Sequence, residues 1–258
     1  MKQQIHPTAL IDPSATIADD VEIGPFAIIG PQVSIARGCR IAARATLEQN
    51  VRLSANVHVG TGTILGGPPQ DLKYAGEETW VDIGENTRIR EFSTINRGTS
   101  AAGVTSVGRN TFIMTYVHIA HDCHIGDGVI MANGTQLAGH VTVEDCAVIS
   151  GLVAVHQFGR IGAHAFIGGM TRVNQDIPPY VKAVGNPVEL YGLNTIGLQR
   201  HKFPATTIAA LKRAYRHCFN SDLNLSQALE RARQDQPTSA EVDRFLEFVS
   251  SSQRGVPA

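Results

Sequence analysis

A six-residue repetition of aliphatic side chains constrains the fold of this chain more than any other feature. Counting in steps of six from Ile5, a large aliphatic residue or methionine occupies nearly every position as far as Val173. Only Asp71, Glu77 and Ala101 break the series. An α-helix repeats about every 3.6 residues and a strand every two, so neither explains the pattern. A period of six predicts a left-handed parallel β-helix, in which three hexapeptides form one triangular coil.

The residues between the repeated positions also follow a rule. A small or polar residue comes directly after each aliphatic residue, as at Ala18, Gly24 and Gly30, and we expect it to let the chain turn a tight corner. Another compact side chain follows four residues after each aliphatic, as at Ala27 and Val33. Successive coils would then stack as parallel strands about 4.8 Å apart around a narrow core.

Two polar stretches interrupt the repeat without changing its phase. Residues 66–80 open with Gly-Gly-Pro-Pro, and residues 99–106 are small and polar, so we expect both to be loops ejected from the prism. Loops of this kind often carry binding residues. The repeat ends after Val173, and we predict a β-helix domain over residues 1–187.

Residues 188–258 are expected to form a domain of about three helices that covers the open end of the β-helix. Four apolar residues share one face of the first helix: Ile208, Leu211, Tyr215 and Phe219. Asn224 is a candidate cap for the second helix. Thr238 and Glu241 have the spacing of a capping box for the third.

Composition excludes several classes of protein. A net charge of -1 and a pI near 6.8 give no sign of nucleic-acid binding. The first residues lack the apolar core of a signal peptide, and no stretch approaches the ~18 apolar residues of a spanning helix, so we expect a cytoplasmic protein without stable membrane insertion. The four cysteines are scattered and are expected to be small buried apolar residues: Cys39, Cys123, Cys146 and Cys218.

Candidate catalytic residues gather between residues 118 and 157. Positions three hexapeptides apart stack in a β-helix, so His121, Gly139 and Gln157 should form one column. His140 should lie on one side of this column and His156 on the other. Such convergence of histidines on one edge indicates a site rather than isolated surface residues.

His121 has the chemistry of a general base, because an ordinary imidazole pKa of about 6.5 leaves the neutral form available at physiological pH. Asp122 is the neighbouring carboxylate that could fix its tautomer, if its side chain reaches the ring. Gly139 could present its backbone N–H to a developing oxyanion.

A metal site is the competing hypothesis. His118, His121 and His124 are closely spaced, but His118 and His124 are one hexapeptide apart and should lie on different faces of the prism. One chain could not gather all three, although ligands could be shared between subunits, as in the β-helical carbonic anhydrases. We otherwise expect no metal and no cofactor. A non-enzymatic ice-binding β-helix would need regular threonine rows, which this chain lacks.

Six short motifs make the chain resemble the UDP-N-acetylglucosamine acyltransferase family, whose members begin lipid A synthesis. They are PQDLKY (69–74), RGT (97–99), HIAHDC (118–123), LAGH (137–140), VHQF (155–158) and GNP (185–187). The resemblance extends over nearly the whole chain. It implies transfer of an (R)-3-hydroxyacyl chain from acyl carrier protein to the 3-hydroxyl of UDP-N-acetylglucosamine, by a homotrimer with active sites between subunits.

The resemblance also implies roles for individual residues. His121 would remove the proton from the sugar hydroxyl, Asp122 would orient His121, and the Gly139 N–H would hold the oxyanion. Gly169 stands at the position of the acyl-length ruler, where a glycine leaves room for a longer chain. Nine residues would line the site or bind the sugar nucleotide: Gln70, Asp71, Lys73, His118, His140, His156, Gln157, Asn194 and Arg200.

Three residues depart from the family pattern, and two of them bear on the acceptor. Asn96 replaces a frequent histidine, Ile196 a frequent glutamate, and His201 a frequent basic residue. The last two remove polar groups from the nucleotide-facing region, so the alternative acceptor is an amino-substituted UDP-sugar. Between residues 190 and 221 there is no acidic residue, which suits an acidic carrier protein. The basic residues there are Arg200, Lys202, Lys212, Arg213 and Arg216.

Overall fold

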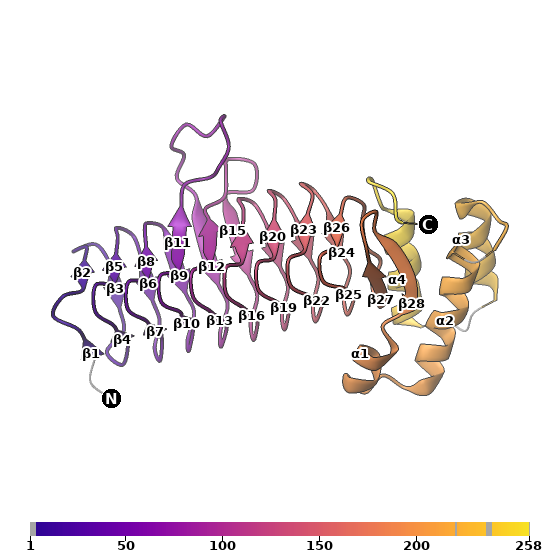
Figure 1. Ribbon diagram of the computed structural model, residues 1–258, viewed down its shortest axis with the longest axis horizontal. Coiled ribbons are helices and arrows are strands. Elements are labelled where there is room, and N and C mark those ends of the chain that lie inside the picture. Colours follow the sequence, from indigo (N-terminus) through magenta and orange to yellow (C-terminus); the bar gives the residue numbers. More distant parts are fainter. Residues whose placement is uncertain (1–3, 220, 236–238, 258) are drawn as a thin grey trace.

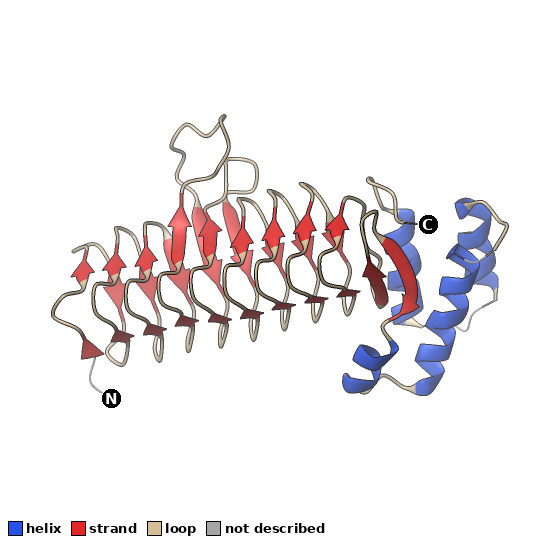
Figure 2. Ribbon diagram, viewed as in Figure 1, coloured by secondary structure: helices blue, strands red, loops and turns tan. Residues whose placement is uncertain are grey.

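The computed structural model describes residues 4–219, 221–235 and 239–257. Most of the chain winds into a long triangular prism of parallel coils, and helices gather at its C-terminal end (Figures 1 and 2). Two loops leave one side of the prism near its middle (Figure 1). The prediction of a parallel β-helix followed by helices is confirmed.

Three sheets form the faces of the prism, and their strands are parallel except for β28 at the end of the first sheet. The first face contains β1 (Gln4–Ile5), β4 (Glu22–Ile23), β7 (Arg40–Ile41), β10 (His58–Val59), β13 (Arg88–Ile89), β16 (Phe112–Ile113), β19 (Ile130–Met131), β22 (Val148–Ile149), β25 (Phe166–Ile167), β27 (Val181–Val184) and β28 (Glu189–Leu193). The second contains β2 (Leu10–Ile11), β5 (Ile28–Ile29), β8 (Thr46–Leu47), β11 (Ile64–Gly67), β14 (Thr94–Asn96), β17 (His118–Ile119), β20 (Gln136–Leu137), β23 (Ala154–Val155) and β26 (Arg172–Val173). The third contains β3 (Thr16–Ile17), β6 (Ser34–Ile35), β9 (Val51–Leu53), β12 (Trp80–Ile83), β15 (Val104–Val107), β18 (His124–Ile125), β21 (Thr142–Val143) and β24 (Arg160–Ile161).

Strand register explains why the loops keep the phase of the repeat. Ile5 pairs with Ile23, which is 18 residues further on. Across the first loop Leu65 pairs with Ile95, a spacing of 30, and across the second Ile95 pairs with Ile119, a spacing of 24. The insertions are thus two hexapeptides and one hexapeptide long. The three exceptions in the aliphatic series all fall within these loops, which confirms that both are ejected.

The corners of the prism follow a different rule from the one we expected. The left-handed backbone conformation occurs three residues after the inward aliphatic, at large residues such as Phe26, Gln32 and Arg44, with φ of 58°, 57° and 57°. The residue directly after the aliphatic is small for another reason. A Cβ at Gly24 would lie 2.8 Å from the backbone N of Ala43 in the next coil. Close stacking of coils, and not the turn itself, therefore requires small residues there.

The C-terminal region contains α1 (Thr195–Arg200), α2 (Ala205–Phe219), α3 (Leu225–Gln234) and α4 (Ala240–Ser250). The first of these was not predicted. Asn224 caps α3, as predicted, and Gln227 completes a capping box with it that was not predicted. Ser239 caps α4 by accepting a hydrogen bond from the Val242 N–H, whereas the predicted cap, Thr238, lies outside the described residues.

The domain boundary after residue 187 remains a prediction. Strand β28 lies beyond it, yet it pairs antiparallel with β27 and extends the first face. The C-terminal segment also returns to the prism, where the Asp176 N–H donates to the Gly255 carbonyl at 2.9 Å. Among the described residues, no helix has the length and apolar composition that a membrane crossing requires.

Candidate active site

A buried histidine–aspartate pair lies at the corner between the second and third faces. The turn between β17 and β18 places Asp122 in the left-handed conformation, with φ of 59°, and directs its carboxylate back to the preceding ring. His121 Nδ1 lies 2.8 Å from Asp122 Oδ2, and the residues are 5% and 8% exposed. An ionised carboxylate accepts a hydrogen bond from Nδ1–H, which leaves the Nε2 lone pair free to take a proton.

The second ejected loop holds Asp122 in place. The Thr99 N–H donates to Asp122 Oδ1 at 2.8 Å, and the Thr99 hydroxyl donates to Oδ2 at 2.7 Å. The Asp122 N–H donates to Thr105 Oγ1 at 2.8 Å. Burial alone raises the pKa of Asp122, but the hydrogen bonds from His121 and Thr99 together lower it below its ordinary value. We did not predict either threonine, although Thr99 completes the RGT motif.

Gly139 lies directly against the His121 ring. A Cβ at this position would lie 2.6 Å from His121 Cε1 and 2.7 Å from Nε2. The position must therefore lack a side chain for the ring to keep its place. Among the described residues, the Gly139 N–H has no hydrogen-bond partner, so it remains available to a bound group.

His140 contacts both members of the His121–Asp122 pair through its ring. Its ring stacks on Phe158 with a centroid distance of 4.6 Å and meets the His121 ring edge-on at 5.1 Å. Its Nε2 lies 3.5 Å from Asp122 Oδ2. The 18-residue spacing of the coils therefore predicted the proximity of His121, Gly139 and His140 correctly. The contact of His140 with Phe158 was not predicted.

A groove of about 770 Å³ runs over the second face beside this corner, next to the first ejected loop. Seven of the predicted residues line it: Gln70, Asp71, Lys73, His118, His121, Gly139 and Gln157. His140 and His156 flank this groove and do not line it. The sequence missed Leu72, whose side chain is fully exposed at the loop tip, and Gln136 on β20.

His118 sits on β17 at the floor of the groove. Its Nδ1 lies 2.7 Å from Thr94 Oγ1. Burial, and secondarily the neighbouring His121, lowers its pKa below the ordinary value. His118 is therefore neutral at physiological pH and offers one donor and one acceptor nitrogen.

Buried polar contacts fix the first loop above the groove. The Arg97 guanidinium donates to the Gly66 carbonyl and, at 3.2 Å, to Tyr74 Oη. Asn96 Nδ2 donates to the Pro68 carbonyl at 2.9 Å. The departure at Asn96 thus has a structural role, because its amide anchors the start of the loop that carries Lys73.

Asn194, Arg200 and Gly169 do not join the groove within one chain. Asn194 caps α1 by accepting from the Gly197 N–H at 3.1 Å, and its Nδ2 donates to the His164 carbonyl at 3.0 Å. Gly169 lies in the turn after β25, where an added Cβ would come no nearer than 3.4 Å to another atom, the Gly151 carbonyl oxygen.

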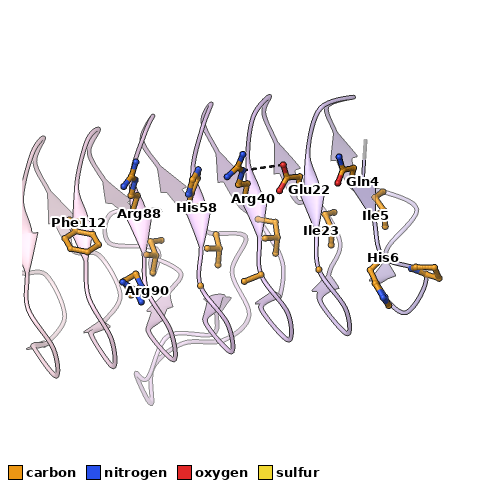
Figure 3. Close-up of a pocket in the computed structure, with 17 residues that line it drawn as sticks. Gln4, Ile5, His6, Glu22, Ile23, Arg40, His58, Arg88, Arg90 and Phe112 are labelled. Carbon is orange, nitrogen blue, oxygen red and sulfur yellow. Dashed lines mark ion pairs between the residues drawn. The ribbon is translucent and has the colours of Figure 1, made fainter. Parts of the chain in front are cut away.

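A second groove, of about 790 Å³, lies on the first face near the N-terminus (Figure 3). Arg40, His58 and Arg88 stand in a row along it, and Arg40 pairs with Glu22 at 3.4 Å (Figure 3). It has no hydrogen-bonded histidine–carboxylate pair among the described residues. We therefore place the chemistry in the groove of the second face.

Within one chain His118, His121 and His124 do not come together, in line with the expectation that they lie on different faces. His124 lies on the third face, where its Nδ1 contacts Ser106 Oγ at 2.7 Å. The donor atoms of His121, Asp122 and His140 do lie within 4.8 Å of one another. However, Asp122 already accepts three hydrogen bonds, which favours an orienting carboxylate over a metal ligand.

Comparisons with known proteins agree with this geometry. A hexapeptide-repeat transferase profile matches residues 14–49 and 105–139, which confirms the left-handed type of β-helix. The fold and the buried His121 site thus define a hexapeptide-repeat transferase.

Longer matches give the particular family. A profile described as UDP-N-acetylglucosamine O-acyltransferase, domain 2, matches residues 176–257. Acyl-[acyl-carrier-protein]–UDP-N-acetylglucosamine O-acyltransferases are 48% identical in Thermodesulfovibrio yellowstonii and 45% identical in Janthinobacterium sp., with 98% of each chain covered. A solved UDP-N-acetylglucosamine acyltransferase of Bacteroides fragilis superposes with a TM-score of 0.97 at 40% identity, covering 99% of this chain and all of that one. The chain belongs to the UDP-N-acetylglucosamine O-acyltransferase family.

Proposed function

We propose that this enzyme transfers an (R)-3-hydroxyacyl chain from acyl carrier protein to the 3-hydroxyl of UDP-N-acetylglucosamine, the first step of lipid A synthesis. The observation that carries the proposal is the buried His121–Asp122 pair, with a bond of 2.8 Å, beside the unpartnered Gly139 N–H in an open groove. The names of relatives that align over nearly the whole chain supply the two substrates.

The residues provide for each step of acyl transfer. His121 Nε2 takes the proton of the sugar hydroxyl as its oxygen attacks the thioester carbonyl, a contribution of roughly 10²–10⁴ in rate. The carbonyl oxygen gains negative charge, and the Gly139 N–H donates a hydrogen bond to it. This contact contributes a factor of roughly 10²–10³ to the rate. The C–S bond then breaks, the carrier thiolate leaves with the proton held by His121, and Asp122 stabilises the imidazolium in between.

The groove supplies contacts for a polar acceptor. Lys73 on the first loop is the cation for a phosphate, and Gln70, Asp71 and Gln157 offer hydrogen bonds to sugar hydroxyls. His118, His140 and His156 complete the polar surroundings. Because Asn194 and Arg200 lie outside the groove of their own chain, we assign them to the groove of a neighbouring subunit.

An exposed apolar edge supports a homotrimer. Five large apolar side chains, each at least half exposed, lie along the corner between the first and second faces, where Arg44, Gly62 and Gly134 occupy the intervening turns: Phe26, Phe92, Tyr116, Leu152 and Met170. An exposed apolar row of this kind marks an association surface. Three prisms joined along it would place the groove of one chain against the first face of the next. Leu152→Lys should therefore lower the native mass measured by light scattering, and an unchanged mass would contradict this packing.

Gly169 follows the same edge, immediately before Met170, and we propose that it ends the path of the acyl chain. The space beside it fits the expectation that glycine admits a longer chain. The acid-free segment of residues 190–221, with α2 at its centre, is the proposed contact for the acidic carrier protein. We place the reaction in the cytoplasm, where acyl carrier proteins and nucleotide sugars are made.

Ile196 on α1 is 66% exposed and stands where the family pattern has a polar residue. The identity of the acceptor sugar is therefore tested directly. The test supplies 3-hydroxyacyl carrier protein with UDP-N-acetylglucosamine or with its 3-amino analogue and compares kcat/KM. We expect the hydroxyl acceptor to be preferred. Preference for the amine would assign this chain to the amino-substituted acceptor, and transfer to neither would overturn the proposed function.

A further inference from the structure

A second cluster of nucleophilic and metal-ligating side chains lies on a different edge of the prism from the proposed active site, between the third and first faces. Cys146 occupies the turn between β21 and β22, and His164 occupies the equivalent turn one coil later, with φ of 57° and 56°. His201 comes directly after α1 and reaches the same place from the helical region. None of the three lines the groove of the proposed active site.

The three donor atoms converge. One ligand atom from each of Cys146, His164 and His201 lies within 4.8 Å of the other two. The two imidazole rings meet edge-on with a centroid distance of 4.7 Å. His164 Nδ1 is shielded from solvent and, among the described residues, has no hydrogen-bond partner. A shielded ring nitrogen without a partner is rare in folded proteins, and this nitrogen is available to bind a ligand.

We propose that Cys146, His164 and His201 form a binding site for a divalent transition metal ion, with Zn²⁺ as the preferred ion. One thiolate and two imidazoles are a zinc donor set, and bond lengths of about 2.3 Å to sulfur and 2.0–2.1 Å to nitrogen hold such atoms about 3.3–3.6 Å apart. His201 is exposed and Cys146 is partly exposed, so small side-chain rotations can close the remaining gap. The thiol loses its proton on binding, and solvent fills the fourth position.

The surrounding charges permit a cation. Arg244 is one positive group near His164, and Glu144 holds it in an ion pair of 2.8 Å; Arg200 and Lys202 flank His201 in the sequence. Asp145, adjacent to Cys146, contributes negative charge on the same turn. The carboxylates of Glu144 and Asp145 therefore offset the positive charge that Arg244 brings to this turn.

The position suggests what a bound metal would do. Asn194 caps α1 and donates to the His164 carbonyl, so His164 already connects the last coils to α1. A metal joining His164 to His201 would fasten the other end of α1 to the same turn. Loading should therefore stabilise the helical region against the prism, independently of the acyltransferase activity.

The experiment titrates metal-free, tag-free full-length protein with Zn²⁺ by calorimetry, and with Co²⁺ while recording the thiolate charge-transfer absorption. We expect one ion per chain and a rise in the unfolding temperature on loading. Cys146→Ser and His201→Gln should each weaken binding more than about tenfold and abolish the temperature rise. Cys218→Ser and His124→Gln are matched controls that keep the site and should bind as wild type does.

A further variant distinguishes this site from the active-site histidines, which are also close enough to share an ion. His121→Ala should retain the Zn²⁺ affinity of the wild type if the metal lies at Cys146. Loss of binding in His121→Ala but not in Cys146→Ser would overturn the proposal. The proposal would also be overturned if wild type and Cys146→Ser bound Zn²⁺ equally, or if neither bound it.

Discussion

Thr99→Val tests whether the second ejected loop sets up the catalytic base. The substitution keeps the volume and removes the hydroxyl that donates to Asp122 Oδ2 at 2.7 Å, while the backbone N–H bond to Oδ1 remains. A hydrogen bond to a charged group is worth about 1.5–3 kcal/mol, and the carboxylate it leaves is buried. The pKa of Asp122 should rise, and the imidazole should be held less firmly.

The expected result is a loss in kcat of about tenfold, since about 1.4 kcal/mol corresponds to that factor, with little change in KM for either substrate. The assay is steady-state acyl transfer as a function of pH, in which the acid limb should move to higher pH. Thr99→Ser, which restores the hydroxyl, should recover the activity and the profile.

A double-mutant cycle makes the prediction refutable. In the Asp122→Asn background, Thr99→Val should lower kcat much less than it does in the wild type, because the carboxylate charge to which Thr99 donates is absent. If the two effects were simply additive, or if Thr99→Val had the wild-type pH profile, Thr99 would not act through Asp122.

Three further predictions concern the same groove and its edge. Gly139→Ala should lower kcat in the transfer assay by about 10²-fold, because its Cβ would lie 2.6 Å from His121 Cε1 and displace the base; an unchanged kcat would contradict the stacking. Gly169→Met should shift donor preference toward shorter acyl chains in a competition assay, and an unaltered preference would exclude this position as the ruler. Because the pKa of Asp122 is lower in the folded state than its ordinary value of 3.8, the ionised carboxylate stabilises the fold above pH 3.8, and this stability is lost as pH falls through the folded-state pKa. Asp122→Asn should therefore flatten the pH dependence of the unfolding free energy below about pH 4. An unaltered slope would refute this.

Much of the fold was predictable because one geometric rule repeats along the chain. An inward aliphatic residue every six positions determines the strands, and the same count places His121 against Gly139. The rule also explains the loops, because insertions of whole hexapeptides leave the register of Leu65 and Ile95 intact. The backbone at the corners was not predictable in this way, since residues as large as Phe26 adopt the left-handed conformation there.

Several parts of the site that the sequence missed come from outside the repeat. Thr99 and Arg97 act through loop conformations, and the spacing of the coils says nothing about where a loop folds back. The short helix α1 was missed because its six residues carry too little apolar pattern, and Asn194 was not recognised as its cap. Cys146 and His164 are one coil apart, but His201 reaches them only through the path of the chain beyond the prism.

The most direct test of the central claim compares acyl transfer from 3-hydroxyacyl carrier protein to UDP-N-acetylglucosamine by wild type and by His121→Ala. His124→Ala serves as the control, since that histidine lies three residues further along, on the third face. The His121 variant should lose roughly 10²–10⁴ in kcat while its native mass and unfolding temperature stay near those of the wild type. Wild-type turnover by His121→Ala would contradict the assignment of His121 as the base.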